Sequence, residues 1–230
     1  MTLKRLTILS AAAIGLALNA NADLLIVNGG FETGPNHLSG WTVASTAGSD
    51  DAFYADSSTT SALNGFPTVG PASGNWYAVS DQSGLVTPET TVLYQNITIP
   101  VGTTSAVLSL DMFVNDMFGS GGFGGEVAIW ATSANPLTDA PLAVVFGPTD
   151  TPVSGGEPNP YVALSANIFG DVTAGQSYKI GILESDSTGP INVGVDNVSL
   201  VTTAVPEPSG LLLLGSLAAA VVFIHRKVRA

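Results

Sequence analysis

Carboxylates are the side chains with the greatest capacity for chemistry in this sequence. The chain has 18 Asp and Glu residues, two His residues and no Cys. Two carboxylates can hydrolyse a glycosidic bond when they face each other in space, but no spacing in the sequence singles out such a pair. A Ser-His-Asp triad needs a His as base. Outside the C-terminal segment the only His is His37, in a turn-like stretch with no Gly-x-Ser-x-Gly motif. We therefore expect no catalytic residues.

The charged residues are distributed unevenly along the chain. Between Asp23 and Ala204 there are 17 acidic residues and one basic residue, Lys179, while the other Lys and Arg lie in the two terminal segments. An acidic surface of this kind repels phosphate, which argues against nucleic-acid binding. The absence of Cys excludes a disulfide framework, a thiolate nucleophile and Cys-based metal clusters.

Aromatic side chains are candidates for ligand binding. Phe118 and Phe123 flank or interrupt the most glycine-dense stretch, Gly119–Gly125, and Tyr94 lies in a predicted strand. An aromatic ring on a loop can stack on the apolar face of a ligand, and an acidic protein would bind a neutral glycan more readily than an anionic polymer. The alternative is that the glycine-rich stretch is only a loop between strands. We expect Trp41, Trp76 and Trp130 in the core.

The N-terminal 22 residues have the pattern of a secretory signal peptide. Lys4 and Arg5 precede a short apolar run, and Ala20-Asn21-Ala22 is a small-x-small cleavage site. Cleavage there would place the mature N-terminus at Asp23. The pattern predicts that the chain is exported.

The C-terminal segment, 205–230, contains a second apolar run. Residues 210–224 carry no charge, and as a helix they would span about 22 Å, shorter than a hydrocarbon core of about 30 Å. The run is followed by Arg226, Lys227 and Arg229, and basic residues favour the cytoplasmic side of a membrane. These features predict one transmembrane helix, with the preceding domain outside the inner membrane.

The segment as a whole resembles the PEP-CTERM sorting signal of Gram-negative bacteria. The resemblance rests on Pro206-Glu207-Pro208, the apolar run and the terminal basic cluster, in that order. It implies that an exosortase, a membrane-embedded peptidase, removes the tail and passes the protein to the cell surface or an extracellular matrix. A plain C-terminal membrane anchor is the alternative.

The central region, 23–204, reads as one all-β domain. Its apolar runs are short and bounded by turn residues, which is typical of a β-sandwich of two antiparallel sheets. In 105–114 the apolar residues occupy alternate positions, so that one face of that strand is predicted to be buried. The predicted strands are 24–27, 41–43, 52–54, 76–80, 92–99, 105–114, 126–131, 142–146, 161–167, 176–184 and 191–201.

This domain also resembles the galactose-binding-like jelly rolls, which include many carbohydrate-binding modules. The resemblance rests on 25–32 followed by Gly40-Trp41, on 93–100 and on the closing 195–200. It implies a jelly roll whose first and last strands are neighbours. In similar modules a Glu and an Asp at the positions of Glu32 and Asp196 ligate a structural Ca²⁺, whose preferred donors are hard oxygens. The alternative is that these two carboxylates bind backbone amides at strand ends.

The sequence thus predicts an exported, non-enzymatic protein of the cell surface or the extracellular matrix, located within exopolysaccharide. The alternative is a carbohydrate-binding module for a neutral glycan. Two or three exposed aromatic residues on one face would favour glycan binding, whereas a hydrolase would need two facing carboxylates in a concave pocket.

Overall fold

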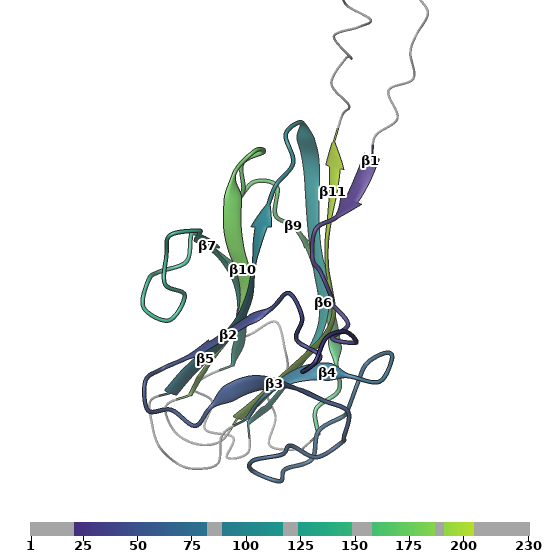
Figure 1. Cartoon of the computed structure of the whole chain (residues 1–230), viewed down its shortest axis with the longest axis vertical. Helices are drawn as coiled ribbons and strands as arrows, with labels where there is room; N and C mark the ends of the chain where they lie inside the picture. Colours follow the sequence, from purple (N-terminus) through teal and green to yellow (C-terminus); the bar gives the residue numbers. More distant parts are fainter. Residues whose placement is uncertain (1–20, 82–88, 117–123, 149–157, 187–190, 205–230) are drawn as a thin grey trace, which may run out of the picture. The chain divides into compact units, whose positions relative to one another are not determined.

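The computed structural model describes residues 21–81, 89–116, 124–148, 158–186 and 191–204, and residues Ala22–Ala204 form one compact unit. Within these ranges the chain is all-β, with eleven strands in two antiparallel sheets and no helix (Figure 1). None of the described residues forms a helix long and apolar enough to cross a membrane. The predicted signal segment up to residue 20 and the tail 205–230 lie outside the described residues.

The first sheet has the strand order β3-β4-β11-β6-β9, and β1 also pairs with β11. Its longest ladder joins β6 to β11, whose register runs from Ile191 opposite Asp116 to Ala204 opposite Thr103, with a bulge between Asp196 and Ser199. The strands of this sheet are β1 (Asn21–Leu24), β3 (Ala52–Asp56), β4 (Tyr77–Asp81), β6 (Thr103–Asp116), β9 (Val162–Asn167) and β11 (Ile191–Ala204).

The second sheet has the strand order β2-β5-β10-β7-β8. Its centre is β10, which pairs antiparallel with β5 on one side and with β7 on the other. The strands of this sheet are β2 (Thr42–Ser45), β5 (Glu89–Thr98), β7 (Gly125–Ala131), β8 (Ala143–Phe146) and β10 (Ser177–Asp186).

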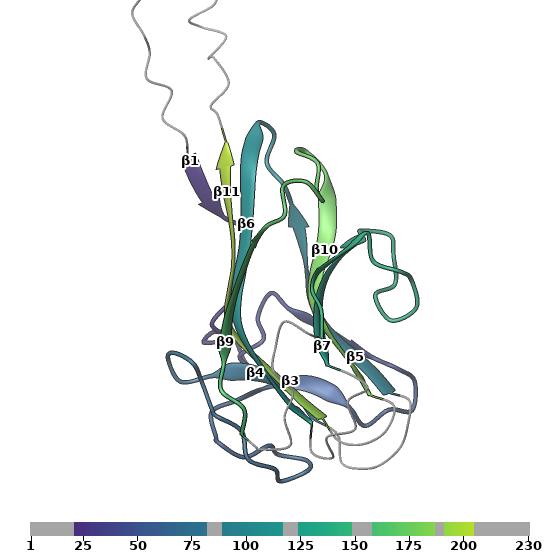
Figure 2. The same cartoon turned by 180° about the vertical axis from the view of Figure 1, so that it is seen from behind.

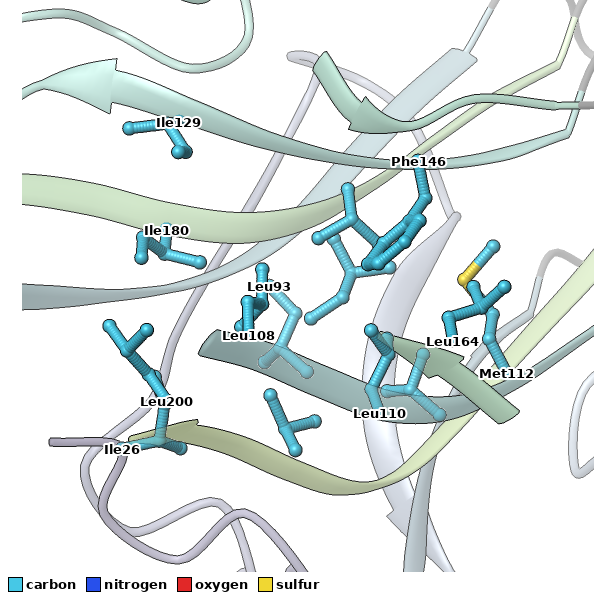
Figure 3. Close-up of a cluster of buried hydrophobic side chains, with 14 of the residues drawn as sticks. Ile26, Leu93, Leu108, Leu110, Met112, Ile129, Phe146, Leu164, Ile180 and Leu200 are labelled. Atoms are coloured by element: carbon cyan, nitrogen blue, oxygen red, sulfur yellow. The ribbon is translucent and has the colours of Figure 1, made fainter. Parts of the chain in front are cut away.

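The main hydrophobic core lies between the two sheets. Figure 3 shows Leu108, Leu110 and Leu200 of the first sheet facing Ile129 and Ile180 of the second. Along β6 the alternate residues predicted to face inward are all buried, which confirms the period of two. The buried residues of this alternation are Ala106, Leu108, Leu110, Met112 and Val114.

All eleven predicted strands are present, with ends that differ by a few residues. The largest difference is at the start, where 24–27 was predicted and β1 is Asn21–Leu24. The side chain of Gln95 binds both the N–H and the carbonyl group of Val27. These backbone groups therefore bond to a side chain and not to a neighbouring strand. Turns precede β6 and β10, where Gly102 and Gly175 adopt positive φ values of 78° and 81°.

The start of β1 and the end of β11 lie side by side at one end of the sandwich (Figures 1 and 2). The pairing continues past β1, because the N–H of Leu25 donates to the carbonyl oxygen of Leu200 at 2.9 Å. Cleavage after Ala22 would remove the first two residues of β1 and leave this hydrogen bond in place.

Candidate functional site

The outer face of the second sheet carries a small apolar cluster of its own. Val92 of β5 and Ala128 and Trp130 of β7 are buried there, although they point away from the main core. They are buried because the segment between β7 and β8 folds back over the sheet, with Ala134 and Leu137 packed against them. This segment, 132–142, is the loop that projects beside β7 in Figures 1 and 2; we call it the β7–β8 loop.

Hydrogen bonds within the β7–β8 loop hold it in shape. The indole N–H of Trp130 donates to the carbonyl oxygen of Asp139 at 3.1 Å, which ties the loop to the sheet below it. The carboxylate of Asp139 accepts the N–H of Asn135 at 2.8 Å and the hydroxyl of Thr138 at 3.3 Å. Because both oxygens of Asp139 accept hydrogen bonds from residues of the same loop, this carboxylate stabilises the loop conformation.

A cavity of about 360 Å³ lies between this loop and the sheet. Its lining combines apolar surface with hydroxyl groups and two carboxylates, those of Glu126 and Asp139. Glu126 is partly buried, and the loss of hydration raises its pKa above the usual range. The remaining lining residues are Thr90, Trp130, Pro136, Leu137, Thr138, Ala140, Pro141, Leu183 and Ser185.

Tyr94, predicted as a ligand-stacking residue, lies on the same outer face but does not line the cavity. It is partly buried and packs on Gly181, where an added Cβ would come within 2.8 Å of the Tyr94 Cβ. The ammonium of Lys179 lies 5.4 Å from the centre of its ring and donates to the carbonyl oxygen of Ala134. Tyr94 and Lys179 therefore support the β7–β8 loop from the neighbouring part of the sheet.

Glu32 and Asp196, the predicted calcium ligands, are brought close together. An ideal Cβ on Gly30 would lie 3.8 Å from Oδ1 of Asp196 and 4.0 Å from Cγ of Glu32. This proximity follows from the pairing of the first and last segments of the domain, in which the N–H of Val198 donates to the carbonyl oxygen of Gly29 at 2.9 Å.

Both carboxylates accept backbone hydrogen bonds from one segment, 72–76. Oε1 of Glu32 accepts the N–H groups of Asn75 at 2.6 Å and Trp76 at 3.0 Å, and these bonds lower its pKa. Oδ2 of Asp196 accepts the N–H of Ser73 at 2.9 Å. The sequence left this kind of amide binding as the alternative to calcium.

Asp196 has a second carboxylate beside it. Asp196 is fully buried and lies directly opposite Asp111 on β6. Burial raises the pKa of Asp196, and the negative charge of Asp111 raises it further, whereas its backbone hydrogen bonds lower it; the net shift is upward. Asn197 bridges the pair, since its side-chain N–H donates to Asp111 at 2.8 Å and its backbone N–H donates to Asp196 at 2.7 Å.

The donor chemistry at this place suits Ca²⁺ in type, because carboxylates and backbone carbonyls are its usual ligands. Across the described ranges, however, no group of three or more His, Cys, Asp or Glu side chains is arranged to hold a metal ion. Calcium at Glu32 and Asp196 therefore stays a prediction.

The aromatic residues of the described ranges form no exposed cluster. Trp41 lies in the main core, as predicted, whereas Trp130 is buried under the β7–β8 loop instead. Trp76 is only partly buried, with its ring stacked on that of His37 at 3.7 Å between centroids. Phe169 is the one aromatic residue with an exposed side chain in the described part of the chain. Phe118 and Phe123 lie outside the described residues, as do the predicted sorting residues Pro206, Glu207, Pro208, Arg226, Lys227 and Arg229.

No protein-family model matches this sequence, and no curated protein matches it. Among solved structures, the chain is similar to the carbohydrate-binding module TmCBM61 in complex with β-1,4-galactotriose, with 14% identity over 77% of this chain and 97% of that chain and a TM-score of 0.43. It is similar to the K1 cleaved adhesin domain of Lys-gingipain from Porphyromonas gingivalis W83, with 13% identity over 81% and 98% and a TM-score of 0.48. It is also similar to a cyclase from Fischerella sp. TAU, with 14% identity over 81% and 100% and a TM-score of 0.49.

The sequence analysis did not predict the cavity under the β7–β8 loop. Glu126, Ala128 and Trp130 alternate along one strand, and this spacing indicates that they share a face. It does not indicate that the face is the outer one, because a Trp within a strand is normally taken as core.

Proposed function

We propose that this protein is an exported, non-enzymatic β-sandwich of the cell surface or extracellular matrix, sorted through its C-terminal segment by an exosortase-type peptidase. The observation that carries the proposal is the position of β11, which runs to Ala204 and so ends one residue short of Pro206-Glu207-Pro208. A tail that starts where the last paired strand stops can be removed without loss of any strand. Both Pro residues disfavour continued regular structure and favour an extended, accessible junction.

Mass spectrometry of the cell-surface form tests this proposal. We expect a C-terminus near Pro206 to Pro208 and the loss of 210–230. Replacing Arg226, Lys227 and Arg229 with Ala should reduce processing, because these charges favour cytoplasmic retention of the tail end. If the intact full-length chain is the sole mature species, the protein is anchored rather than sorted by cleavage.

We further propose that the domain is a jelly roll, as its sequence resemblance implies. The pairing of its first strand with its last, β1 with β11, supports this assignment. A structural Ca²⁺ at Glu32 and Asp196 belongs to the same proposal, supported by the proximity of the two carboxylates to Gly30.

The second candidate function is binding of a neutral glycan. The cavity under the β7–β8 loop supports it, because its volume of about 360 Å³ lies within the range of small-molecule sites, roughly 300–1,000 Å³. Binding rather than hydrolysis is supported by Asp139, whose two oxygens already accept hydrogen bonds within the loop. A glycosidase would need a second available carboxylate beside Glu126.

A further inference from the structure

The cavity under the β7–β8 loop has an amphipathic lining on a rigid base. Leu137, Leu183 and the ring of Trp130 supply apolar surface, while Thr90 and Ser185 supply hydroxyl groups that lie 3.3 Å from each other. Apart from Leu137, which lies in the loop, these residues belong to strands β5, β7 and β10, which form a continuous ladder. A lining of this kind matches a ligand with apolar C–H faces and a rim of hydroxyl groups.

Glu126 is the polar group of the cavity with the greatest capacity to bind a ligand. No hydrogen bond to its side chain is formed within the described residues, whereas Asp139 is engaged inside the loop. A carboxylate is an acceptor of hydrogen bonds, and a bond to a charged acceptor is stronger than one between neutral groups. Loss of hydration raises the pKa of Glu126, so a ligand hydroxyl that donates to it would restore part of what burial removes.

The charge of the lining selects against anions. The described residues of the lining include two carboxylates and no Lys, Arg or His, and the surrounding domain has one basic residue, Lys179. An acidic sugar or a phosphate would be repelled. A bare metal ion is a poor match as well, because most of the cavity wall is apolar or hydroxylic and hard cations prefer several converging oxygen ligands.

We infer that the cavity under the β7–β8 loop binds one or two pyranose rings of a neutral glycan, with sugar hydroxyls donating to Glu126 and bonding to Thr90 and Ser185, and with C–H groups on Leu137 and Leu183. The inference rests on the second candidate function above and locates its site. It moves the predicted contact away from Tyr94, which lies outside the cavity.

Calorimetric titration of the full-length chain tests the inference. The probes are the trisaccharides of glucose, galactose, mannose and xylose, with a galacturonic acid trisaccharide as the anionic probe and spermidine as the cationic one. We expect at least one neutral trisaccharide to bind and the anionic one not to bind. Glu126→Gln should weaken binding about tenfold, because it removes a charged acceptor.

Two further variants make the result specific. Thr90→Val keeps the side-chain shape and removes one hydroxyl, so it should weaken binding severalfold. Asp171→Asn removes one negative charge from an exposed turn between β9 and β10 and should leave the Kd within about twofold. The melting temperature of each variant shows whether it is folded.

Each outcome has one meaning. Neutral sugars that bind equally well to the Glu126→Gln and Thr90→Val variants would place the site elsewhere and leave glycan binding standing. Failure of every neutral trisaccharide to bind the unmodified chain would overturn both glycan binding and this site. Spermidine that binds through Glu126, with no sugar bound, would make the cavity a cation site and overturn the inference. Proteolytic sorting of the tail is unaffected by any of these results.

Discussion

Glu32 and Asp196 bind the same short segment on either side of Gly74, with Asp196 accepting the N–H of Ser73 and Glu32 accepting those of Asn75 and Trp76. Two residues from opposite ends of the domain therefore fasten the segment that leads into β4. The close approach also explains Gly74, where a Cβ would meet Oε1 of Glu32 and where φ is +64°.

The bonds to Glu32 predict a pH-dependent stability. Its pKa is lowered in the folded state, so its contribution is present above the unfolded-state pKa and is lost as the pH falls through the folded-state pKa. We expect Glu32→Gln to lower the free energy of unfolding by about 1 kcal/mol at pH 7, a modest loss because the group is exposed and screened. The loss should shrink as the pH falls below 4.5 and through the lowered folded-state pKa. Urea unfolding over this pH range measures the loss.

Glu126→Gln is the matched control, because the pKa of Glu126 is shifted the other way. A raised folded-state pKa means that the charge opposes folding at pH 7, so removing it should not lower the free energy of unfolding. Equal losses of unfolding free energy for Glu32→Gln and Glu126→Gln at pH 7 would contradict the opposite pKa shifts of the two carboxylates.

Calcium is predicted to stabilise the domain if Glu32 and Asp196 ligate it. Binding to the folded state alone raises stability by mass action, by about 2.7 kcal/mol at a hundredfold excess over Kd. We expect calcium to raise the melting temperature and a chelator to lower it. The Glu32→Ala, Asp196→Ala double variant should show no calcium response; a response that persists, or none in the unmodified chain, rejects this site.

Asp81 is predicted to be the most sensitive acidic residue in the first sheet. It is fully buried and accepts the hydroxyl of Tyr54 at 3.0 Å and the N–H groups of Leu63 at 2.6 Å and Asn64 at 3.3 Å. Asp81→Ala would leave these donors unpaired, and we expect a loss of about 3 kcal/mol in unfolding free energy. Tyr54→Phe removes the hydroxyl that donates to Asp81 and accepts the N–H of the exposed Ala62, and it should cost about 1 kcal/mol. Similar losses of unfolding free energy for both variants in chemical denaturation would contradict the conclusion that Asp81 satisfies several donors at once.

Two glycines provide a test of packing. A Cβ on Gly194 of β11 would lie 2.0 Å from Cε1 of Phe113, whereas a Cβ on Gly170 would meet nothing within 4 Å. We expect Gly194→Ala to cost about 2 kcal/mol or more through overpacking, and Gly170→Ala to be neutral or slightly stabilising. Melting curves of the two variants compare the same added methyl group at a crowded and an open position.

The strands could be predicted because local rules decide them. Alternation in β6, and glycines at positive φ after Val101 and Ala174, set the ends and faces of strands without reference to distant residues. The first strand was misplaced because Gln95, far away in sequence, binds the backbone of Val27. No local pattern contains that contact.

The candidate site was less predictable, for a similar reason. The sequence indicates that Glu126 and Trp130 share a face of β7, but the β7–β8 loop alone makes that outer face a buried one. The shape of the loop depends on the hydrogen bond from Asn135 to Asp139 and on the bond from the indole N–H of Trp130 to the carbonyl oxygen of Asp139. These are tertiary contacts among ordinary turn residues, and composition carries no trace of them.

The position of β11 also has a mechanical consequence. This strand is interior to its sheet, paired with β6 on one side and with β4 and β1 on the other, and the C-terminal segment continues from it. Tension applied through that segment acts along β11 and loads many ladder hydrogen bonds together, where an edge strand would peel away bond by bond. A protein held at a surface by this end is therefore tethered through its most strongly paired strand.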